Sequence, residues 1–286
     1  MRIRIGTRGS ALALAQAQIA AQRLGASAEL VVIRTSGDAT DRPITELGDG
    51  VFVTAIEDAL RRGEIDVAVH SLKDLPTGER PGLVIAAILE REDPRDVLIT
   101  RSRGGLSTLP PNALVGTSSP RRDAFLRVLR PDVTLRPIRG NVDTRLRKVR
   151  DGEYDGTVLA LAGLRRLRFD VADAEILGAL DCPPAPGQGA LAIQCRADDP
   201  ETIAAVARLD HRPTRLAVEA ERETLRLLGA SCEIPLGTWG RSLDGDIVLD
   251  ASLPVDGVIT RARATGTDPL AVGRAVADAL GGRVVV

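Results

Sequence analysis

Six arginines stand at or just beyond the ends of predicted strands, namely Arg8, Arg121, Arg122, Arg139, Arg145 and Arg166. In open α/β sheets, ligands bind beyond the carboxyl ends of the strands, where free N–H groups at helix N-termini also attract anions. Because a guanidinium binds carboxylates through paired hydrogen bonds, arginines that converge there predict a small ligand with several carboxylates or phosphates. The alternative for any single arginine is a solvated surface position beside a carboxylate.

Asp74 lies in the sequence HSLKDLP (70–76), after another predicted strand and directly before Leu75 and Pro76. A carboxylate at this place is suited to stabilising a developing cation or to carrying protons. Alternatively, Asp74 is a turn residue that begins the chain reversal at Pro76, and the sequence favours neither interpretation. His70, at the end of the same strand, is expected to be structural, with its ring packed and hydrogen-bonded.

Cys232 lies in GASCEIPLG, a loop of small residues just beyond a long predicted helix. Small neighbours leave the sulfur accessible, and a thiolate is well suited to covalent attachment of a ligand. The alternative is a buried, inert cysteine, which is what we expect of Cys182 and Cys195. Three widely spaced cysteines without a CxxC pair, and only two histidines, predict no metal site.

Composition limits the class of protein. The chain has 286 residues, of which 44% are hydrophobic and 27% charged, so it is too apolar to be disordered, and its length suggests about two domains. The net charge of -1 argues against a non-specific nucleic-acid binder. No secretory signal is evident, and no stretch reaches the roughly 18 apolar residues of a membrane-spanning helix. We therefore expect a cytosolic protein with free thiols.

The elements that must position these residues alternate between short β-branched runs and helical stretches. This alternation predicts an α/β fold with largely parallel sheets and helices packed outside them. Segments 91–95 and 183–189 interrupt it with Pro, Gly and charged residues, as is typical of hinges or domain crossings. A long amphipathic helix from about Pro213, three β-like runs and a last helix from Asp268 predict a small α+β domain at the end of the chain.

A family resemblance is carried by eight segments in order along the chain. They are TRGSALALAQ (7–16), HSLKDLP (70–76), EREDPRD (90–96), GTSSPRR (116–122), RGNVDTRL (139–146), GEYDGTVLALAGLRRL (152–167), PGQGA (186–190) and ASCEIPLG (230–237). Together they resemble the porphobilinogen deaminases, also called hydroxymethylbilane synthases. A single such segment would be suggestive, whereas the ordered set is highly specific.

The resemblance implies a cytoplasmic, usually monomeric transferase of tetrapyrrole biosynthesis. Such an enzyme joins four porphobilinogen molecules head to tail, releasing ammonia and then the linear tetrapyrrole hydroxymethylbilane. It carries a dipyrromethane cofactor, here expected as a thioether on Cys232. The implied fold has two periplasmic-binding-protein-like α/β domains flanking a cleft and a small C-terminal α+β domain. Expected boundaries are 1–90 with about 190–208 for domain 1, about 95–185 for domain 2, and about 212–286 for domain 3.

The resemblance implies roles only for residues at positions that match the motifs of the family. Asp74 resembles the catalytic aspartate, which also contacts the cofactor. Residues that resemble those holding the cofactor are Ser10, Lys73, Thr117, Ser119, Arg121 and Arg122. Residues that resemble those guiding the incoming ring and the growing chain are Arg8, Gln16, Arg139, Arg145, Arg166 and Gln188.

One departure from the family pattern bears on function. Members commonly have a lysine in a glycine-rich loop where this chain has Asp49, so that role is not carried over. The departure supports an alternative, a degenerate paralogue that binds porphobilinogen without polymerising it. A broader alternative is a non-catalytic protein that clamps a small polycarboxylate between two α/β domains.

Overall fold

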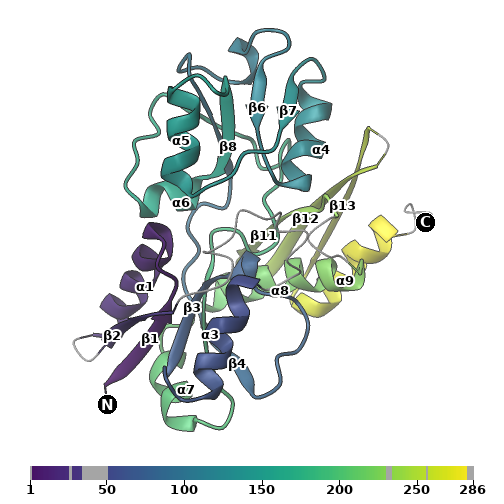
Figure 1. Cartoon of the computed structure of the whole chain (residues 1–286). Coiled ribbons are helices and arrows are strands. Elements are labelled where there is room, and N and C mark those ends of the chain that lie inside the picture. The colour runs from purple at the N-terminus through teal and green to yellow at the C-terminus, as the bar shows by residue number, and fades with distance from the viewer. Residues whose placement is uncertain (1, 26–27, 34–50, 230–233, 256, 282–286) are drawn as a thin grey trace. The chain divides into compact units, whose positions relative to one another are not determined.

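The predicted alternation of strands and helices gives three sheets in the described part of the chain. The computed structural model describes residues 2–25, 28–33, 51–229, 234–255 and 257–281. It divides into two compact units. Unit 1 comprises Met1–Glu92 and Ala190–Leu216, and unit 2 comprises Asp93–Gly189 and Ala217–Val286. Each unit has at least one sheet and a buried core of its own, and Figure 1 labels many of their elements.

Unit 1 is built on a five-stranded sheet in the order β2-β1-β3-β10-β4. Its strands are β1 (Ile3–Thr7), β2 (Ala28–Val32), β3 (Val67–Ser71), β4 (Leu83–Ile88) and β10 (Leu191–Arg196). Its helical segments are α1 (Ala11–Leu24), α3 (Val51–Arg61), η2 (Leu72–Asp74) and α7 (Pro200–Ala207). Strand β1 is parallel to β2 and β3, whereas β10 is antiparallel to β3 and β4. At the centre of the sheet, Ile193 pairs with Val69 on one side and Ala87 on the other.

Helix α1 shows how the sequence fixes local structure here. Ser10 caps it, its side chain accepting a hydrogen bond from the N–H of Ala13 at 3.3 Å, as predicted from a helix starting near Ser10. The buried positions Gln16, Ala17, Ala20 and Leu24 lie on one face of the helix. That face packs on β1 and β3, which places the helix start at the carboxyl end of β1.

Unit 2 contains a second five-stranded sheet in the order β7-β6-β8-β5-β9. Its strands are β5 (Asp96–Thr100), β6 (Leu114–Gly116), β7 (Thr134–Arg136), β8 (Gly156–Ala160) and β9 (Glu175–Ile176). Helical segments η3 (Leu106–Thr108), α4 (Pro120–Leu129), α5 (Val142–Arg150) and α6 (Leu161–Arg166) accompany them (Figure 1). Strand β6 is parallel to β7 and β8, but β5 is antiparallel to β8 and β9.

The expectation of largely parallel sheets is therefore corrected. Each five-stranded sheet pairs half of its neighbouring strands parallel and half antiparallel. The reason is that a strand buried on both faces reads as a continuous apolar run whatever its direction. Strand β10, with the sequence LAIQCR, is buried at its first five positions, so its composition indicates burial and not its direction.

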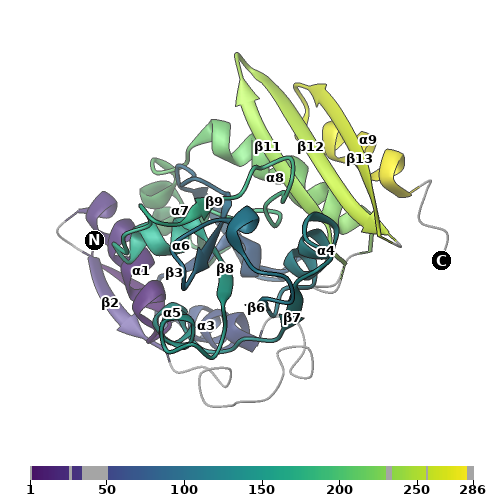
Figure 2. The ribbon, with the colours of Figure 1, turned by 90° about the horizontal axis from the view of Figure 1, so that it is seen from above.

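The end of the chain forms a three-stranded antiparallel sheet, as the sequence predicts. Its strands are β11 (Gly237–Leu243), β12 (Asp246–Val255) and β13 (Val258–Gly266), accompanied by α8 (Arg212–Leu227) and α9 (Pro269–Gly281). Helix α9 lies along β12 and β13 (Figure 2). A Cβ atom at Gly240 would lie 2.6 Å from the carbonyl oxygen of Ala217, so only glycine permits this approach of β11 to α8. None of the helices in the described ranges has the length and apolar character needed to cross a membrane.

Candidate active site

Four of the residues predicted for the site line one pocket of unit 1. The pocket has a volume of about 70 Å³, and its lining includes Arg8, Ser10, Gln16 and Asp74. Strands β1 and β3 are parallel, so the segments that follow them emerge at the same edge of the sheet. Arg8 comes directly after β1, and Asp74 ends the short helix η2 that follows β3. Parallel pairing thus brings these two side chains to one place.

Two hydrogen bonds hold elements that contribute to the lining of this pocket. The amide Nε2 of Gln16 donates to the hydroxyl of Ser71 at 2.8 Å, which ties α1 to the end of β3. The N–H of Leu72 donates to the carbonyl of Ala190 at 3.0 Å, which anchors η2 to the start of β10. Lys73 and Asp74 are exposed on this anchored turn, although Lys73 is not part of the pocket lining.

His70 also lines this pocket, a position that sequence reasoning did not assign to the site. Its side chain is buried, and burial lowers the pKa of the imidazole to about 4, with Gln194 opposing and Arg80 reinforcing the shift. The ring is therefore uncharged at neutral pH. Its burial fits the structural expectation. In the described part of the chain Nε2 of the ring has no hydrogen-bond partner, whereas a side-chain hydrogen bond with Gln194 opposes the shift of the pKa.

In unit 2, Arg121 and Arg122 share one buried carboxylate, that of Asp96. Arg121 donates from Nη2 to Asp96 Oδ2 at 2.6 Å, and Arg122 donates to Oδ2 and Oδ1 at 3.2 and 2.8 Å. All three residues are at most 7% exposed. Burial alone would raise the pKa of Asp96, but the charges of Arg121 and Arg122 outweigh it and lower that pKa well below its usual range. Asp96 therefore fixes the orientation of both guanidinium groups.

Gln188 supports the same carboxylate. Its amide Nε2 donates to Asp96 Oδ1 at 2.8 Å and to the carbonyl of Pro94 at 2.6 Å. Sequence reasoning assigned Gln188 to the substrate and gave Asp96 no role, although Asp96 ends the EREDPRD segment. The available signal was an acidic residue opening a strongly apolar strand, DVLIT, because a buried charge requires partners.

The first turn of α4 presents these arginines. Ser119 caps α4, its hydroxyl accepting from the N–H of Arg122 at 3.4 Å, and Pro120 is the first helical residue, as predicted. Thr117 is buried, and its hydroxyl accepts from the N–H of Ser119 at 3.2 Å. These contacts use Thr117 and Ser119 to shape the turn between β6 and α4.

Two of the predicted arginines, Arg122 and Arg139, lie close enough to Arg145 to affect its pKa. Burial lowers the pKa of Arg145, and the positive charges of Arg122 and Arg139 lower it further. Arg145 donates from Nε to the carbonyl of Gly140 at 2.8 Å, and the φ of 105° at Gly140 gives the turn before α5 its shape. Convergent positive charges of this kind favour an anion at the carboxyl ends of β6 and β7. Arg166 donates from Nη2 to the carbonyl of Gly189 at 2.5 Å.

The remaining predictions concern cysteines, the loop aspartate and metals. Cys232 and Asp49 lie outside the described residues. Cys182 and Cys195 are free cysteines, and both are buried, as expected. Burial raises the pKa of each thiol to about 11, which supports the prediction that they are inert. Within the described ranges, no group of three or more His, Cys, Asp and Glu side chains is placed to hold a metal ion.

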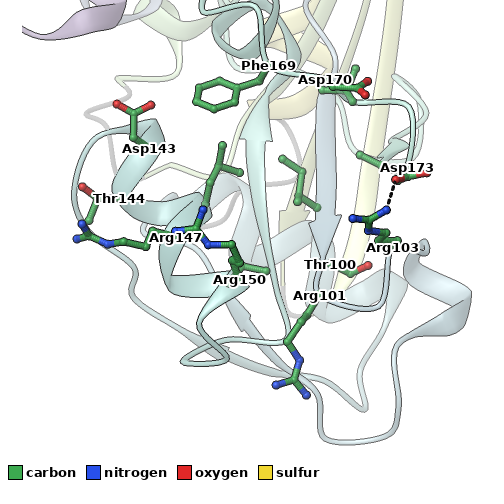
Figure 3. Close-up of a pocket in the computed structure, with 15 residues that line it drawn as sticks. Thr100, Arg101, Arg103, Asp143, Thr144, Arg147, Arg150, Phe169, Asp170 and Asp173 are labelled. Carbon is green, nitrogen blue, oxygen red and sulfur yellow. Dashed lines mark hydrogen bonds and ion pairs between the residues drawn. The ribbon is translucent and has the colours of Figure 1, made fainter.

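A pocket of about 820 Å³ in unit 2 is separate from the predicted residues. Figure 3 shows its lining, with Phe169 at one end, Arg147 and Arg150 on α5, and the Arg103–Asp173 ion pair at 3.3 Å. None of the residues that the sequence assigns to the site lines this pocket. Volume alone therefore does not identify the functional region of unit 2.

Known porphobilinogen deaminases are similar to this chain along most of its length. The family model "Porphobilinogen deaminase, dipyromethane cofactor binding domain" matches residues 3–204. Porphobilinogen deaminase of Nocardia farcinica is 47% identical over 97% of this chain and 85% of its own length, and that of Roseiflexus sp. is 45% identical over 99% and 97%. The enzyme of Mycobacterium leprae is 49% identical over 85% of this chain and 79% of its own length.

A periplasmic binding protein of Salmonella typhimurium with high arginine specificity aligns with a TM-score of 0.40 and 12% identity, covering 75% of this chain and 94% of that one. The sequence relatives, in contrast, match along nearly the whole chain at close to half of all positions. By these matches the chain belongs to the porphobilinogen deaminase family.

Proposed function

We propose that this chain is a porphobilinogen deaminase, which condenses four porphobilinogen molecules head to tail and releases ammonia and hydroxymethylbilane. The observation that carries the assignment of residues is that Arg122 and Arg139 lie near Arg145, whose pKa their positive charges lower. Every pyrrole ring of the substrate brings an acetate and a propionate, so the growing chain is a polycarboxylate. Paired guanidinium groups are the side chains best suited to bind it.

The dipyrromethane cofactor supplies the covalent primer to which rings are added, and its thioether is proposed on Cys232. The hydrogen-bond donors of unit 2 fit the carboxylates of this cofactor. Asp96, Pro183, Val158 and the sulfur of Cys182 accept hydrogen bonds from only part of the N–H groups of Arg121 and Arg122, which leaves N–H donors on both guanidiniums. Ser10, Lys73, Thr117 and Ser119 complete the proposed cofactor set.

Asp74 is proposed as the catalytic residue. Its carboxylate is exposed at the end of η2, in the lining of the same pocket as Arg8. There it accepts hydrogen bonds from pyrrole N–H groups and stabilises the positive charge that develops as ammonia leaves. The neutral state of His70 matters here, because the imidazole adds no positive charge to that of Arg8 beside the carboxylate.

Six residues are proposed to hold the substrate and the growing chain. They are Arg8, Gln16, Arg139, Arg145, Arg166 and Gln188. The proposed functional division is into three domains, with the boundaries predicted from the sequence. We further propose a monomeric cytoplasmic enzyme that binds no nucleic acid, since the net charge of -1 offers no excess of positive charge.

Intact-protein mass spectrometry with peptide mapping tests this proposal directly. The purified chain is expected to carry the mass of two linked pyrrole units on Cys232, and Cys232→Ser is expected to carry none. Asp74→Ala is expected to keep the adduct and the fold but to lose turnover, because the carboxylate acts on the transition state. A chain that stays unmodified after incubation with porphobilinogen is instead a binding paralogue. Normal turnover by Asp74→Ala would remove Asp74 from the mechanism.

A further inference from the structure

Pro137 and Ile138 connect strand β7 to Arg139, which is proposed to bind the growing chain. The parallel register of β7 with β6 ends at the pair of Gly116 and Arg136. Beyond that pair, side chains bind the carbonyl of Pro137 and both backbone groups of Ile138. The place from which the Arg139 side chain starts therefore depends on those side chains.

Ser118 binds both backbone groups of Ile138. Its hydroxyl accepts a hydrogen bond from the N–H of Ile138 at 3.1 Å and donates to the carbonyl of the same residue at 2.8 Å. Ser118 lies in the turn between β6 and α4, next to Ser119, which caps the helix that carries Arg122. One hydroxyl thus ties the turn before Arg122 to the residue before Arg139.

Tyr154 holds the carbonyl of Pro137. Its hydroxyl donates to that carbonyl at 2.7 Å, and Tyr154 is only 6% exposed. The ring packs in a buried cluster with Ile138 and Val149, and the guanidinium of Arg136 lies over the ring at 4.7 Å from its centre. Because this packing fixes the ring, the hydroxyl keeps the carbonyl of Pro137 in one position.

The residues after Ile138 lead directly to the second arginine of this region. Gly140 has a φ of 105°, and its carbonyl accepts from Nε of Arg145 at 2.8 Å. Arg139 and Arg122 lie near enough to Arg145 for their charges to lower its pKa. A shift of the backbone before Arg139 would therefore change the spacing of these charges.

We propose that Tyr154 and Ser118 are positioning residues for binding of the growing chain. By holding the two residues before Arg139, they fix the backbone from which its side chain reaches the substrate, so that Arg139 and Arg145 bind carboxylates of the chain together. Neither hydroxyl has to contact the substrate for this role. The inference rests on the proposed function, because it presupposes that Arg139 binds the growing chain.

Tyr154→Phe and Ser118→Ala test this role by removing one hydroxyl each. Tyr154→Phe keeps the packed ring but takes this donor from the carbonyl of Pro137, and Ser118→Ala takes the hydroxyl from both backbone groups of Ile138. We expect turnover to fall about 10-fold in each variant, since a misplacement of about 1 Å can cost up to about 100-fold. Intact mass should show the cofactor still attached, with adducts of intermediate length accumulating. Ser118 is exposed, so Ser118→Ala serves if Tyr154→Phe does not fold.

A double-mutant cycle with Arg139→Leu distinguishes positioning from a general loss of structure. If Tyr154 acts through Arg139, Tyr154→Phe should lower turnover little further in the Arg139→Leu background, because the side chain that it positions is already gone. The same is expected of Ser118→Ala. Losses that are undiminished in that background would mean that both hydroxyls act elsewhere, which would overturn the inference.

The matched control is Thr224→Val in helix α8. The buried hydroxyl of Thr224 donates to the carbonyls of Ala220 and Gly273 at 3.1 and 3.0 Å, so its removal costs hydrogen bonds outside β6, β7 and α5. Thr224→Val is expected to turn over at the wild-type rate. Ser118→Thr keeps a hydroxyl at the exposed position and is expected to recover the turnover lost in Ser118→Ala.

The remaining outcomes separate this inference from the proposed function. Wild-type turnover in both Tyr154→Phe and Ser118→Ala would overturn the inference, as would an equal loss in Thr224→Val. A wild-type chain that gains no adduct from porphobilinogen would instead overturn the proposed function, and this inference with it.

Discussion

Arg122 binds Asp96 through two parallel hydrogen bonds, Nε to Oδ2 at 3.2 Å and Nη2 to Oδ1 at 2.8 Å. This bidentate pair is buried inside unit 2, where the carboxylate is 0% exposed. Such a pair stabilises a fold mainly by specifying one geometry, since taking both charges out of water offsets much of their attraction. Asp96 therefore serves to hold the arginine in place.

Replacing Asp96 by Asn should be strongly destabilising. Two buried guanidiniums would lose their shared counter-charge, and breaking a buried ion pair by removing one partner costs about 3–5 kcal/mol. Urea unfolding of Asp96→Asn measures the loss. The control is Asp132→Asn, whose carboxylate pairs with Arg130 at an exposed position and whose loss should change stability little. Equal losses for both variants would contradict the role given to Asp96.

Removing either member of the convergent pair Arg139 and Arg145 should stall elongation. Arg145→Leu or Arg139→Leu leaves a substrate carboxylate without its donor, and a hydrogen bond to a charged group contributes about 1.5–3 kcal/mol. Turnover is expected to fall about 10- to 100-fold, with adducts of intermediate length accumulating on the protein. The control is Arg147→Leu. Arg147 is on helix α5, as Arg145 is, but it lines the separate pocket of about 820 Å³. An adduct distribution identical to that of the wild type would exclude both arginines from chain binding.

His70 should make stability depend on pH. Its pKa is about 4 in the folded protein against 6.5 for the free side chain, so between these values the unfolded chain binds a proton that the folded protein excludes. The contribution of His70 to the free energy of unfolding is therefore fully present above pH 6.5. It declines as the pH falls toward 4, by up to about 1.4 kcal/mol per pH unit. His70→Asn should show a shallower decline between pH 7 and 4 in urea unfolding. Parallel profiles would mean that His70 is not buried as a neutral ring.

Cys182 and Cys195 should resist thiol reagents in the folded protein. Both are buried, and with a pKa of about 11 each thiol is almost fully protonated at pH 8. In the Cys232→Ser variant we expect no labelling by a disulfide reagent under native conditions and two labelled thiols after denaturation. Rapid native labelling of either cysteine would show that its surroundings open on the timescale of the assay.

Much of the fold could be predicted from local signals in the sequence. The Ser119-Pro120 pair predicted both the cap and the first residue of α4, because a serine hydroxyl and a proline without an N–H suit those two positions. The alternation of strands and helices likewise predicted α1, α5 and the C-terminal sheet. Each of these elements is specified by residues a few positions apart.

The parts that the sequence did not predict depend on partners far apart along the chain. Asp96 meets Arg121 across 25 positions and Gln188 across 92, and Glu221 meets Gly187 across 34. No local periodicity encodes such pairs. The same holds for the direction of β10, since an apolar run specifies burial but not whether its neighbours are parallel.

The position of β10 in its sheet also bears on how the chain is assembled during synthesis. Among the described strands, β4 hydrogen-bonds only to β10, and β10 separates it from β3. Residues 93–189 are synthesised after β4 and before β10. Folding generally proceeds domain by domain as the chain emerges from the ribosome. Until Leu191 follows, β3 and β4 therefore present open edges, which can pair with other chains. A nascent chain stopped at Gly189 should accordingly need chaperone protection that the finished protein does not.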